Sequence, residues 1–332
     1  MSASDKLNQI AKIKRSQATK ERVAFGHALA SAEWETRDER DALISIAIKA
    51  NKLRACASVV WLREFLSTGQ SKMTNALLCK LPFLCEVCAV RRQAKLFAAA
   101  VPKVDFVMRE DPGLVPVMIT RTIKSGPDLR RQADHFRSSR EKMRKAVNRS
   151  KSSKSNNKRH WEMGKVLGQI RAFEVKKAKG NEDHWHFHEH IFGLIHEWID
   201  VEKLSAEWRE VTGDSFVVHV QKCEAKPGVE GSTPANSGLV EVIKYPLKFA
   251  GLRACDAWHA YSVLSGSRMA ECLGLLRGVK VGHLEEDEPL EDESGPYVDF
   301  VCHWLESRES YRISTVAAYG EAMTKGNPYA AR

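Results

Sequence analysis

Four histidines recur at every second position in the run "DHWHFHEHIFGLI", residues 183–195. Residues two apart in an extended strand share one face, so we expect all four imidazoles to project together. On a helix they would scatter around the axis. Imidazoles gathered in this way are typical of a metal site. The four residues are His184, His186, His188 and His190.

A carboxylate is expected on the same face. The segment "VLGQIRAFEVKKA" (166–178) reads as a strand, and Gly180 and Asn181 suit a turn into the histidine run. A hairpin folded about residue 181 places Glu174 opposite His188. The histidines could instead be ordinary polar surface groups, which is the usual role of a single histidine. The opposite face carries apolar residues suited to a core, namely Phe173, Val175, Trp185, Phe187 and Ile191.

Two other histidine enzymes do not fit these positions. A zinc protease helix needs a histidine at the place that Phe192 occupies after the pair His188-Glu189. A nucleobase deaminase needs a histidine two residues before its glutamate, where Phe187 stands. The deaminase cysteine pair should also follow the histidine, whereas "CEVC" precedes it. Neither class is supported.

A second chemical feature is the run "LVEVIKYPLKF", in which Glu241 precedes Tyr245 by four residues. On a helix this spacing brings the two side chains within hydrogen-bonding reach. A tyrosine phenol with a pKa near 10 is a poor nucleophile at neutral pH, and a carboxylate with nearby cations such as Lys244 and Lys248 would activate it. An ordinary helical Tyr–Glu pair is the alternative. Pro246 predicts a bend at the tyrosine.

The cysteines indicate a further site. Cys79, Cys85 and Cys88 crowd into "CKLPFLCEVCAVRR", and Cys56 lies upstream. Two thiolates separated by two residues can bind one tetrahedral zinc ion, and the other two cysteines would complete a four-sulfur shell. Alternatively, Cys56 is a small core residue and the other three are incidental.

The chain is basic, with 52 Lys and Arg against 42 Asp and Glu and a formal net charge of +10. This excess favours a polyanionic partner such as DNA. The basic stretches could also be merely solvated. Candidate phosphate contacts lie after the cysteine cluster, on the predicted helix "PDLRRQADHFRSSREKMRKAV" and beside the tyrosine, namely Arg91, Arg92, Arg144, Lys145 and Lys244.

The elements that must position these residues follow from periodicity. Residues 1–100 are expected to be a mainly helical region with the cysteine site, 101–280 the domain that carries the chemistry, and 281–332 an acidic linker with a C-terminal tail. The acidic segment 284–293 could instead mimic DNA. "RMAECLGLLRG" reads as a helix that ends at Gly278. Strands are expected at residues 115–124, 166–176, 184–194 and 215–221.

No apolar run is long enough to cross a bilayer, and the N-terminus lacks the apolar core of a secretory signal. We therefore expect a cytoplasmic protein.

Four segments, taken in order, resemble the rolling-circle plasmid replication initiators of the HUH endonuclease superfamily. They are "CKLPFLCEVCAVRR", "VMITRTIK", "VLGQIRAFEV...HWHFHEHIFGLI" and "EVIKYPLK". The resemblance covers roughly residues 50–280. It implies an α+β fold, with a central antiparallel sheet of about five strands, helices on one side and the tyrosine helix across the open face. It also implies an endonuclease that nicks one strand of a plasmid origin and rejoins it at termination.

By this resemblance Tyr245 is the nucleophile, which stays joined to the 5′ phosphate and leaves a 3′ hydroxyl for a polymerase. Glu241 resembles the carboxylate that replaces a second tyrosine in one branch. Lys248 is placed in the catalytic group for the positive charge that it adds beside the tyrosine. The family histidine motif, Trp-His-Pro-His-x-His, aligned on the tryptophan, makes His188 and His190 the metal pair, with Glu174 as carboxylate ligand and His186 nearby. Phe187 and Glu189 depart from the motif, and a shifted pair, His186 and His188, stays open.

The implied cofactor is Mg²⁺ or Mn²⁺ at the nicking site, together with the possible structural Zn²⁺. No nucleotide is expected, because a phosphotyrosine conserves the energy of the broken bond and no "GxxxxGK" loop is present. The implied partners are the plasmid double-strand origin, single-stranded at the nick, and the host replication helicase and polymerase. Two alternatives stay open. One is a relaxase or transposase of the same superfamily, and the other is a noncatalytic DNA-binding protein with a structural metal.

Overall fold

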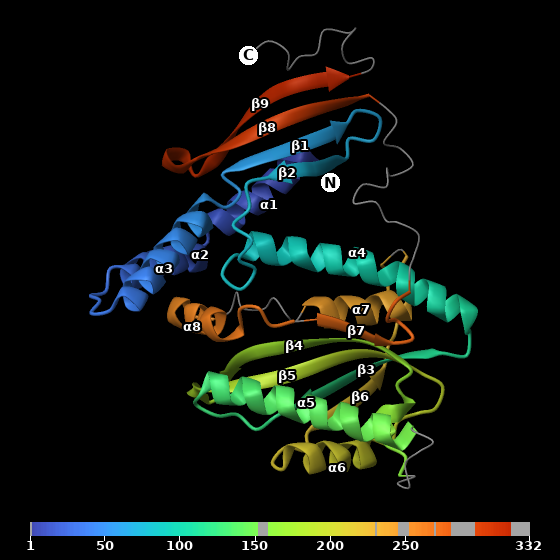
Figure 1. Ribbon diagram of the computed structural model, residues 1–332. Coiled ribbons are helices and arrows are strands. Elements are labelled where there is room, and N and C mark those ends of the chain that lie inside the picture. Colours follow the sequence, from blue (N-terminus) through green and yellow to red (C-terminus); the bar gives the residue numbers. More distant parts are fainter. Residues whose placement is uncertain are drawn as a thin grey trace. The chain divides into compact units, whose positions relative to one another are not determined.

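The chain divides into two compact units of unequal size (Figure 1). The first unit comprises residues 1–91, 253–258 and 284–332, and the second comprises residues 92–252 and 259–283. The computed structural model describes residues 2–151, 159–229, 231–244, 252–268, 270–279 and 296–319. No helix in these described ranges is long and apolar enough to cross a membrane.

The first unit combines N-terminal helices with a four-stranded antiparallel sheet of strand order β2-β1-β8-β9. Two of the helices begin with a reciprocal capping box, Ser2 with Asp5 and Thr36 with Glu39, which fixes where each helix starts. The elements are α1 (Ala3–Arg15), α2 (Gln17–Ala30), α3 (Arg37–Ala55), β1 (Val59–Phe65), β2 (Ser71–Ala76), β8 (Tyr297–Leu305), the short 3-10 helix η3 (Glu306–Arg308) and β9 (Ser310–Tyr319).

This sheet was not expected from the sequence. Strand β1 pairs with β8, and Arg63 of β1 forms an ion pair with Asp299 of β8, 236 positions later, with an Nε–Oδ1 distance of 2.8 Å. Local hydrophobic pattern cannot reveal pairing between segments so far apart in the chain. The expected helical N-terminal region, residues 1–100, therefore contains α1, α2, α3, the β1–β2 hairpin and the start of a further helix at Glu86. The sheet of the hairpin is completed by the C-terminal strands.

Two helices run from one unit into the other. Helix α4 (Glu86–Glu110) has Pro102 in its interior, and α8 (Ala254–Leu264) begins in the first unit.

The second unit is built on a five-stranded antiparallel sheet of order β6-β3-β5-β4-β7, with β5 at its centre. The hairpin expected about residue 181 is confirmed, and Gly180 takes the left-handed conformation at its turn, with φ of 80°. The strands are β3 (Val115–Thr122), β4 (Gly168–Ala178), β5 (Asn181–Ile195), β6 (Val218–Lys222) and β7 (Ala270–Gly274).

The helix expected at "RMAECLGLLRG" is wrong. Residues 270–274 form strand β7, which pairs antiparallel with β4 from Gly168↔Gly274 to Ala172↔Ala270. A short apolar run has no decisive period, and here pairing with the open edge of β4 selects the strand. The fifth strand of the sheet is thus supplied by a segment that was read as helical.

Helices cover both faces of this sheet (Figure 1). On one face, Phe136 of α5 packs against Phe173 and Phe187, with ring centroids 5.8 and 5.5 Å apart. These two sheet phenylalanines belong to the apolar face expected for the hairpin, and all five residues of that face are buried. The helices and the 3-10 turn of this unit are α5 (Leu129–Lys151), η1 (Glu162–Lys165), α6 (Val201–Thr212) and α7 (Pro234–Lys244).

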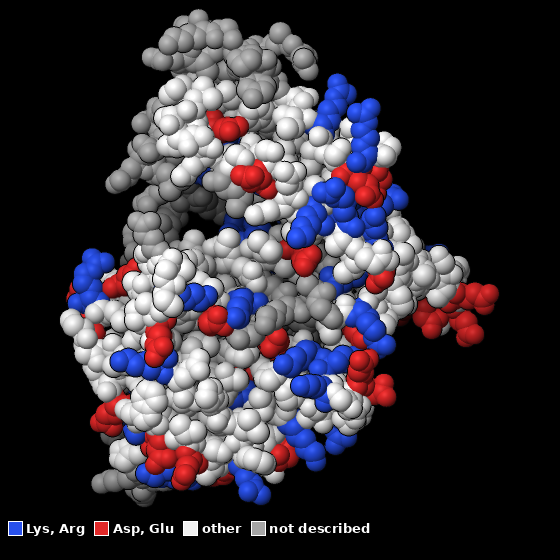
Figure 2. Space-filling model, turned by 180° about the vertical axis from the view of Figure 1, so that it is seen from behind, with Lys and Arg blue, Asp and Glu red and all other residues white. Residues whose placement is uncertain are grey.

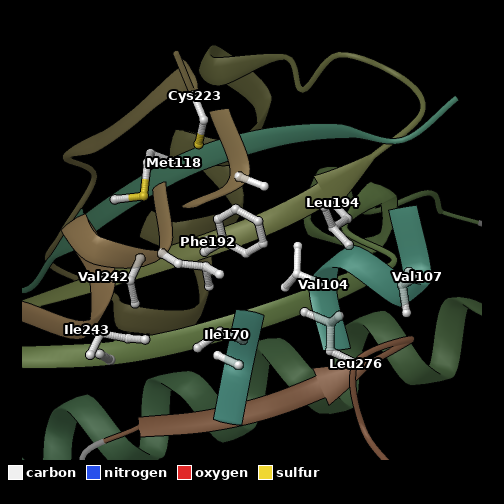
Figure 3. Close-up of a cluster of buried hydrophobic side chains, with 14 of the residues drawn as sticks. Val104, Val107, Met118, Ile170, Phe192, Leu194, Cys223, Val242, Ile243 and Leu276 are labelled. Atoms are coloured by element: carbon white, nitrogen blue, oxygen red, sulfur yellow. The ribbon is translucent and has the colours of Figure 1, made fainter. Parts of the chain in front are cut away.

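The other face carries α7 and the C-terminal part of α4 over an apolar core (Figure 3). Phe192 of β5 lies at its centre between Val104 of α4 and Val242 of α7. Gly238 lets α7 approach the sheet closely, because a Cβ there would lie 2.5 Å from the Cys223 sulfur and 2.9 Å from the Phe192 ring. The expected α+β class is confirmed, and the added finding is that α4 joins α7 on this face.

A buried charge cluster lies on the α5 side of the sheet. Glu189 is fully buried and directly opposite Arg121 in the β3–β5 register, and it accepts a hydrogen bond of 2.6 Å from the Nε of that arginine. Arg140 of α5 approaches its other oxygen to 2.7 Å, and Arg171 lies 3.9 Å away. Burial alone would raise the pKa of Glu189, but the three guanidinium groups outweigh it and hold the pKa at about 2.

The Glu189→Gln variant should be strongly destabilised. It keeps the shape but removes the charge that offsets buried arginines, and breaking such a cluster costs about 3–5 kcal/mol. Urea unfolding of the full chain measures the loss. The matched control is Glu210→Gln, which breaks an exposed pair with Arg159 and should cost under about 1 kcal/mol. Equal effects of the two substitutions would contradict a structural role for Glu189.

Candidate functional site

The histidine face of β5 has the predicted register. His188 lies directly opposite Glu174 of β4, and His190 lies opposite Ala172. The Nε2 atom of His190 is 3.6 Å from the Glu174 carboxylate, which is close enough for both to contact one ion at about 2.1 Å. The rings of His188 and His190 are stacked with centroids 5.9 Å apart, and the ring of His186 lies 4.2 Å from that of His188.

Hydroxyl groups orient two of these rings. Thr120 Oγ1 lies 3.2 Å from Nδ1 of His190, and Ser125 Oγ lies 2.7 Å from Nδ1 of His186. When Nδ1 of a histidine is engaged by a neighbouring polar group, its Nε2 atom is left to act as a ligand, and the ring is held in place. Thr120 occupies this position because it pairs with His190 across β3 and β5.

The His188 ring is half-buried, next to the buried ring of His190. Burial, followed by the neighbouring His186 and Lys176, lowers its pKa to about 3, and burial lowers that of His186 as well. The Nε2 atom of His188 is enclosed and has no hydrogen-bond partner among the described residues. A neutral imidazole with an unused ring nitrogen can serve as a metal ligand.

The histidine face is more open than a closed metal cage. Within the described part of the chain, the only group of three or more His, Cys, Asp or Glu residues whose ligand atoms all lie within 4.8 Å of one another is a cysteine group. The histidine face therefore brings His190 and Glu174 together as a pair, with His188 and His186 beside them. His184 lies at the outer end of β5, past the shift in the β4–β5 register.

Helix α7 carries Glu241 and ends at Lys244, which together form an ion pair. Lys226 lies 3.9 Å from the same carboxylate. Gln93 of α4 donates a 3.0 Å hydrogen bond to the Lys244 carbonyl, which anchors the end of α7. Glu241 also borders a cavity of about 380 Å³ that includes Met118 and Gln221 of the histidine face. The predicted residues Tyr245, Pro246 and Lys248 lie outside the described residues.

The basic residues predicted to contact DNA lie on different helices. Arg144 and Lys145 are on α5, over the face opposite the histidines, and both pair with Glu141. Lys244 and Arg92 are on α7 and α4 on the histidine side, and Arg91 falls in the first unit. On the side of the molecule shown in Figure 2, Lys and Arg are interspersed with Asp and Glu. The structure therefore does not gather these five residues.

Three polar residues of this face were missed by sequence reasoning. Thr120 and Ser125 contact the imidazoles, and His219 of β6 lies opposite Thr120 on the same face. Strand alternation could have placed Thr120 and His219 on that face, but nothing in the local sequence shows which strands are neighbours.

The four predicted cysteines come together in the first unit. Cys56, Cys79, Cys85 and Cys88 are all buried, and three of their sulfur–sulfur distances are 3.4, 3.5 and 3.7 Å. Four sulfurs bound tetrahedrally at about 2.3 Å from one ion would lie about 3.8 Å apart. These distances also exceed a disulfide bond, and all four cysteines are free thiols. The group can hold a structural metal ion such as zinc.

Nearby cations fit the charge of such a centre. Lys14 donates a 2.7 Å hydrogen bond to the Cys56 carbonyl. Burial lowers the pKa of its amine, and attraction to Cys56, Cys79 and Cys85 offsets only part of this effect. Arg22 is buried beside Leu84, whose carbonyl it contacts, and is also attracted to Cys85. Four thiolates around one divalent ion leave two negative charges, which these cations would offset.

A comparison with protein families identifies the chain. The model of the family described as Replication protein matches residues 70–311, which is more than half of the sequence. The chain therefore belongs to the Replication protein family. No curated protein and no solved structure matches it significantly. The match spans the cysteine pair at the start of α4, the histidine strand and α7.

Purified protein should contain one tightly bound zinc ion per chain, measured by elemental analysis. Cys88→Ser should lose this zinc and unfold at lower temperature, since the binding energy of a structural zinc is also folding energy. The matched control is Cys255→Ser, which changes an exposed cysteine of the same unit and should retain the ion. Zinc retained by Cys88→Ser, or absent from the wild type, would contradict a zinc site.

Proposed function

We propose that this protein is a plasmid rolling-circle replication initiator of the HUH endonuclease type, which nicks one strand of origin DNA. The observation that supports this most strongly is the pairing of His188 and His190 with Glu174 on one face of a central strand, in a member of the Replication protein family. Imidazole and carboxylate groups in a row on a sheet suit a divalent cation that contacts a phosphate.

The residues present fit Mg²⁺ or Mn²⁺. His190 and Glu174 offer two ligand atoms 3.6 Å apart, and His188 offers an enclosed nitrogen without a hydrogen-bond partner among the described residues. A divalent cation held there would polarise the scissile phosphate and offset the charge that builds up on its oxygens. Imidazole ligands favour Mn²⁺, whereas availability favours Mg²⁺.

The proposed reaction is a transesterification. The phenol of Tyr245 gives up its proton as its oxygen bonds to the phosphorus, the bond from phosphorus to the 3′ oxygen breaks, and that oxygen takes up one proton and leaves as a hydroxyl. The 5′ phosphate stays on the tyrosine, so no nucleotide is consumed. Tyr245 is assigned from the sequence resemblance and Lys248 from its positive charge nearby in the sequence, since both lie outside the described residues.

Glu241 has a separate role in this proposal. Its carboxylate would accept a proton from the water or hydroxyl that resolves the phosphotyrosine and ends replication. The ion pair with Lys244 holds this carboxylate at the end of α7, directly before the tyrosine segment. The Cys56, Cys79, Cys85 and Cys88 group would bind zinc and serve structure, not catalysis.

The proposed partners follow from the reaction. The plasmid double-strand origin, unwound at the nick, is the substrate, and the host helicase and polymerase act on the nicked product in the cytoplasm. A relaxase or transposase would use the same geometry, but the family match favours replication. A noncatalytic DNA-binding protein would leave the enclosed His188 nitrogen and Glu241 without a chemical role.

Nicking should produce a covalent protein–DNA adduct through Tyr245. The wild-type chain is incubated with Mn²⁺ and a single-stranded origin oligonucleotide labelled at its 3′ end, which the adduct retains. Denaturing electrophoresis should show a shifted band that is absent for Tyr245→Phe. The control Tyr261→Phe changes a tyrosine of α8 and should form the adduct at the wild-type rate.

Two outcomes would overturn the proposal. An undiminished adduct in Tyr245→Phe would exclude that residue as nucleophile. Origin binding by the wild type without any adduct would favour the noncatalytic alternative.

A further inference from the structure

A positively charged cavity lies on the α5 side of the sheet, opposite the histidines. Its volume is about 240 Å³, smaller than the cavities that enclose drug-sized ligands. Gln169 and Arg171 of β4 border it, and they alternate along the strand with Ala172 and Glu174 of the histidine face. Its cationic lining residues are Arg121, Arg140, Arg144, Lys151, Arg171 and Arg277, and no acidic residue among the described ones lines it.

Carboxylates behind the wall offset only part of this charge. Glu189 pairs with Arg121 and Arg140, and Glu271 pairs with Arg140 and Arg171. Outside the cavity, Glu141 pairs with Arg144. Three carboxylates therefore face six cations, which leaves three positive charges around the cavity.

Two of the cations are free to meet a ligand. Lys151 at the end of α5 and Arg277 after β7 are both exposed, and neither has an ion-pair partner among the described residues. They flank a floor of apolar side chains that includes Met143, Met163 and Val166. Apolar walls reduce the local dielectric, so the field of the cations is stronger here than on an open surface.

We propose that this cavity binds a phosphate group, distinct from the phosphate at the histidine face. The guanidinium of Arg277 can donate two parallel hydrogen bonds to phosphate oxygens, and Lys151 adds a point charge. One phosphate cannot occupy both sites, because their residues point to opposite faces of β4. The phosphate could belong to a nucleic-acid backbone away from the nick or to a small phosphorylated molecule. This proposal does not depend on nicking.

Calorimetric titration of the full chain tests whether the cavity binds phosphate. No Mg²⁺ or Mn²⁺ is added, so that no divalent cation occupies the histidine face. The probes are inorganic phosphate and, separately, a single-stranded oligonucleotide without terminal phosphates. The double variant Lys151→Ala with Arg277→Ala should weaken phosphate binding by at least about tenfold, as expected for lost charge-assisted hydrogen bonds. Both side chains are exposed, so the melting temperature should stay unchanged.

Matched variants separate a site from general charge. Arg149→Ala removes a cation from the last turn of α5 that does not line the cavity, and it should bind phosphate within about twofold of wild type. Arg277→Glu should abolish binding, whereas Arg277→Lys should restore part of it.

The two probes distinguish the sources of the phosphate. Parallel loss of oligonucleotide and phosphate affinity in the double variant, with competition between the probes in wild type, supports a nucleic-acid backbone. Loss of phosphate affinity alone supports a small phosphorylated ligand. Phosphate binding that is equal in wild type and the double variant, or undetectable in wild type, would overturn the proposal.

Discussion

The alternation of β5 between two unlike environments is the constraint on which this structure depends. His188 and His190 face Glu174 on one side of the sheet, and Glu189, the residue between them, faces three arginines on the other. A slip of β5 by one residue would turn the Glu189 carboxylate to the face that carries Glu174 and would turn the histidines toward the arginines. Both sides would then lose their charge complementarity, so one register is selected.

Several interactions hold that register. Arg121 lies directly opposite Glu189 across β3 and β5, and the turn at Gly180 fixes the β4–β5 hairpin. The packing of Phe136 on Phe173 and Phe187 secures α5 over the same face. A buried charge cluster is costly unless all its members are paired, so it discriminates strongly between alternative pairings. The cluster therefore also positions the histidines, because Glu189 lies between His188 and His190 on β5 and points to the opposite face.

The sequence predicted the parts of this arrangement that depend on local pattern. The period of two along β5, with suitable turn residues beside it, was enough to place Glu174 opposite His188, and the spacing of the "CEVC" pair indicated a four-sulfur group. Strand β7 was misread because pairing with β4, not its own pattern, determines its conformation. Strands β8 and β9 and the contacts of Thr120 depend on partners distant in the chain, which a single sequence does not identify. The roles of Tyr245 and Lys248 stay predictions.

The departure of this chain from the family histidine motif has a physical explanation. The resemblance predicts an apolar residue between the two proposed ligands, whereas here this position is Glu189, neutralised by Arg121, Arg140 and Arg171. The substitution therefore leaves the alternation of the motif intact. His186, His188 and His190 all point away from that cluster, so the proposed pair of His188 and His190 rests on the approach of His190 to Glu174.

The most direct test of this account is a titration with Mn²⁺ followed by electron paramagnetic resonance. We predict one Mn²⁺ site per chain in the wild type, and at least tenfold weaker binding when His188 and His190 are both replaced by Ala. His196→Ala is the control, because that residue pairs with Asp111 elsewhere in the second unit and should leave the site unchanged. Equal Mn²⁺ affinity in the wild type and the double variant would contradict the assignment of the histidine face as the metal site.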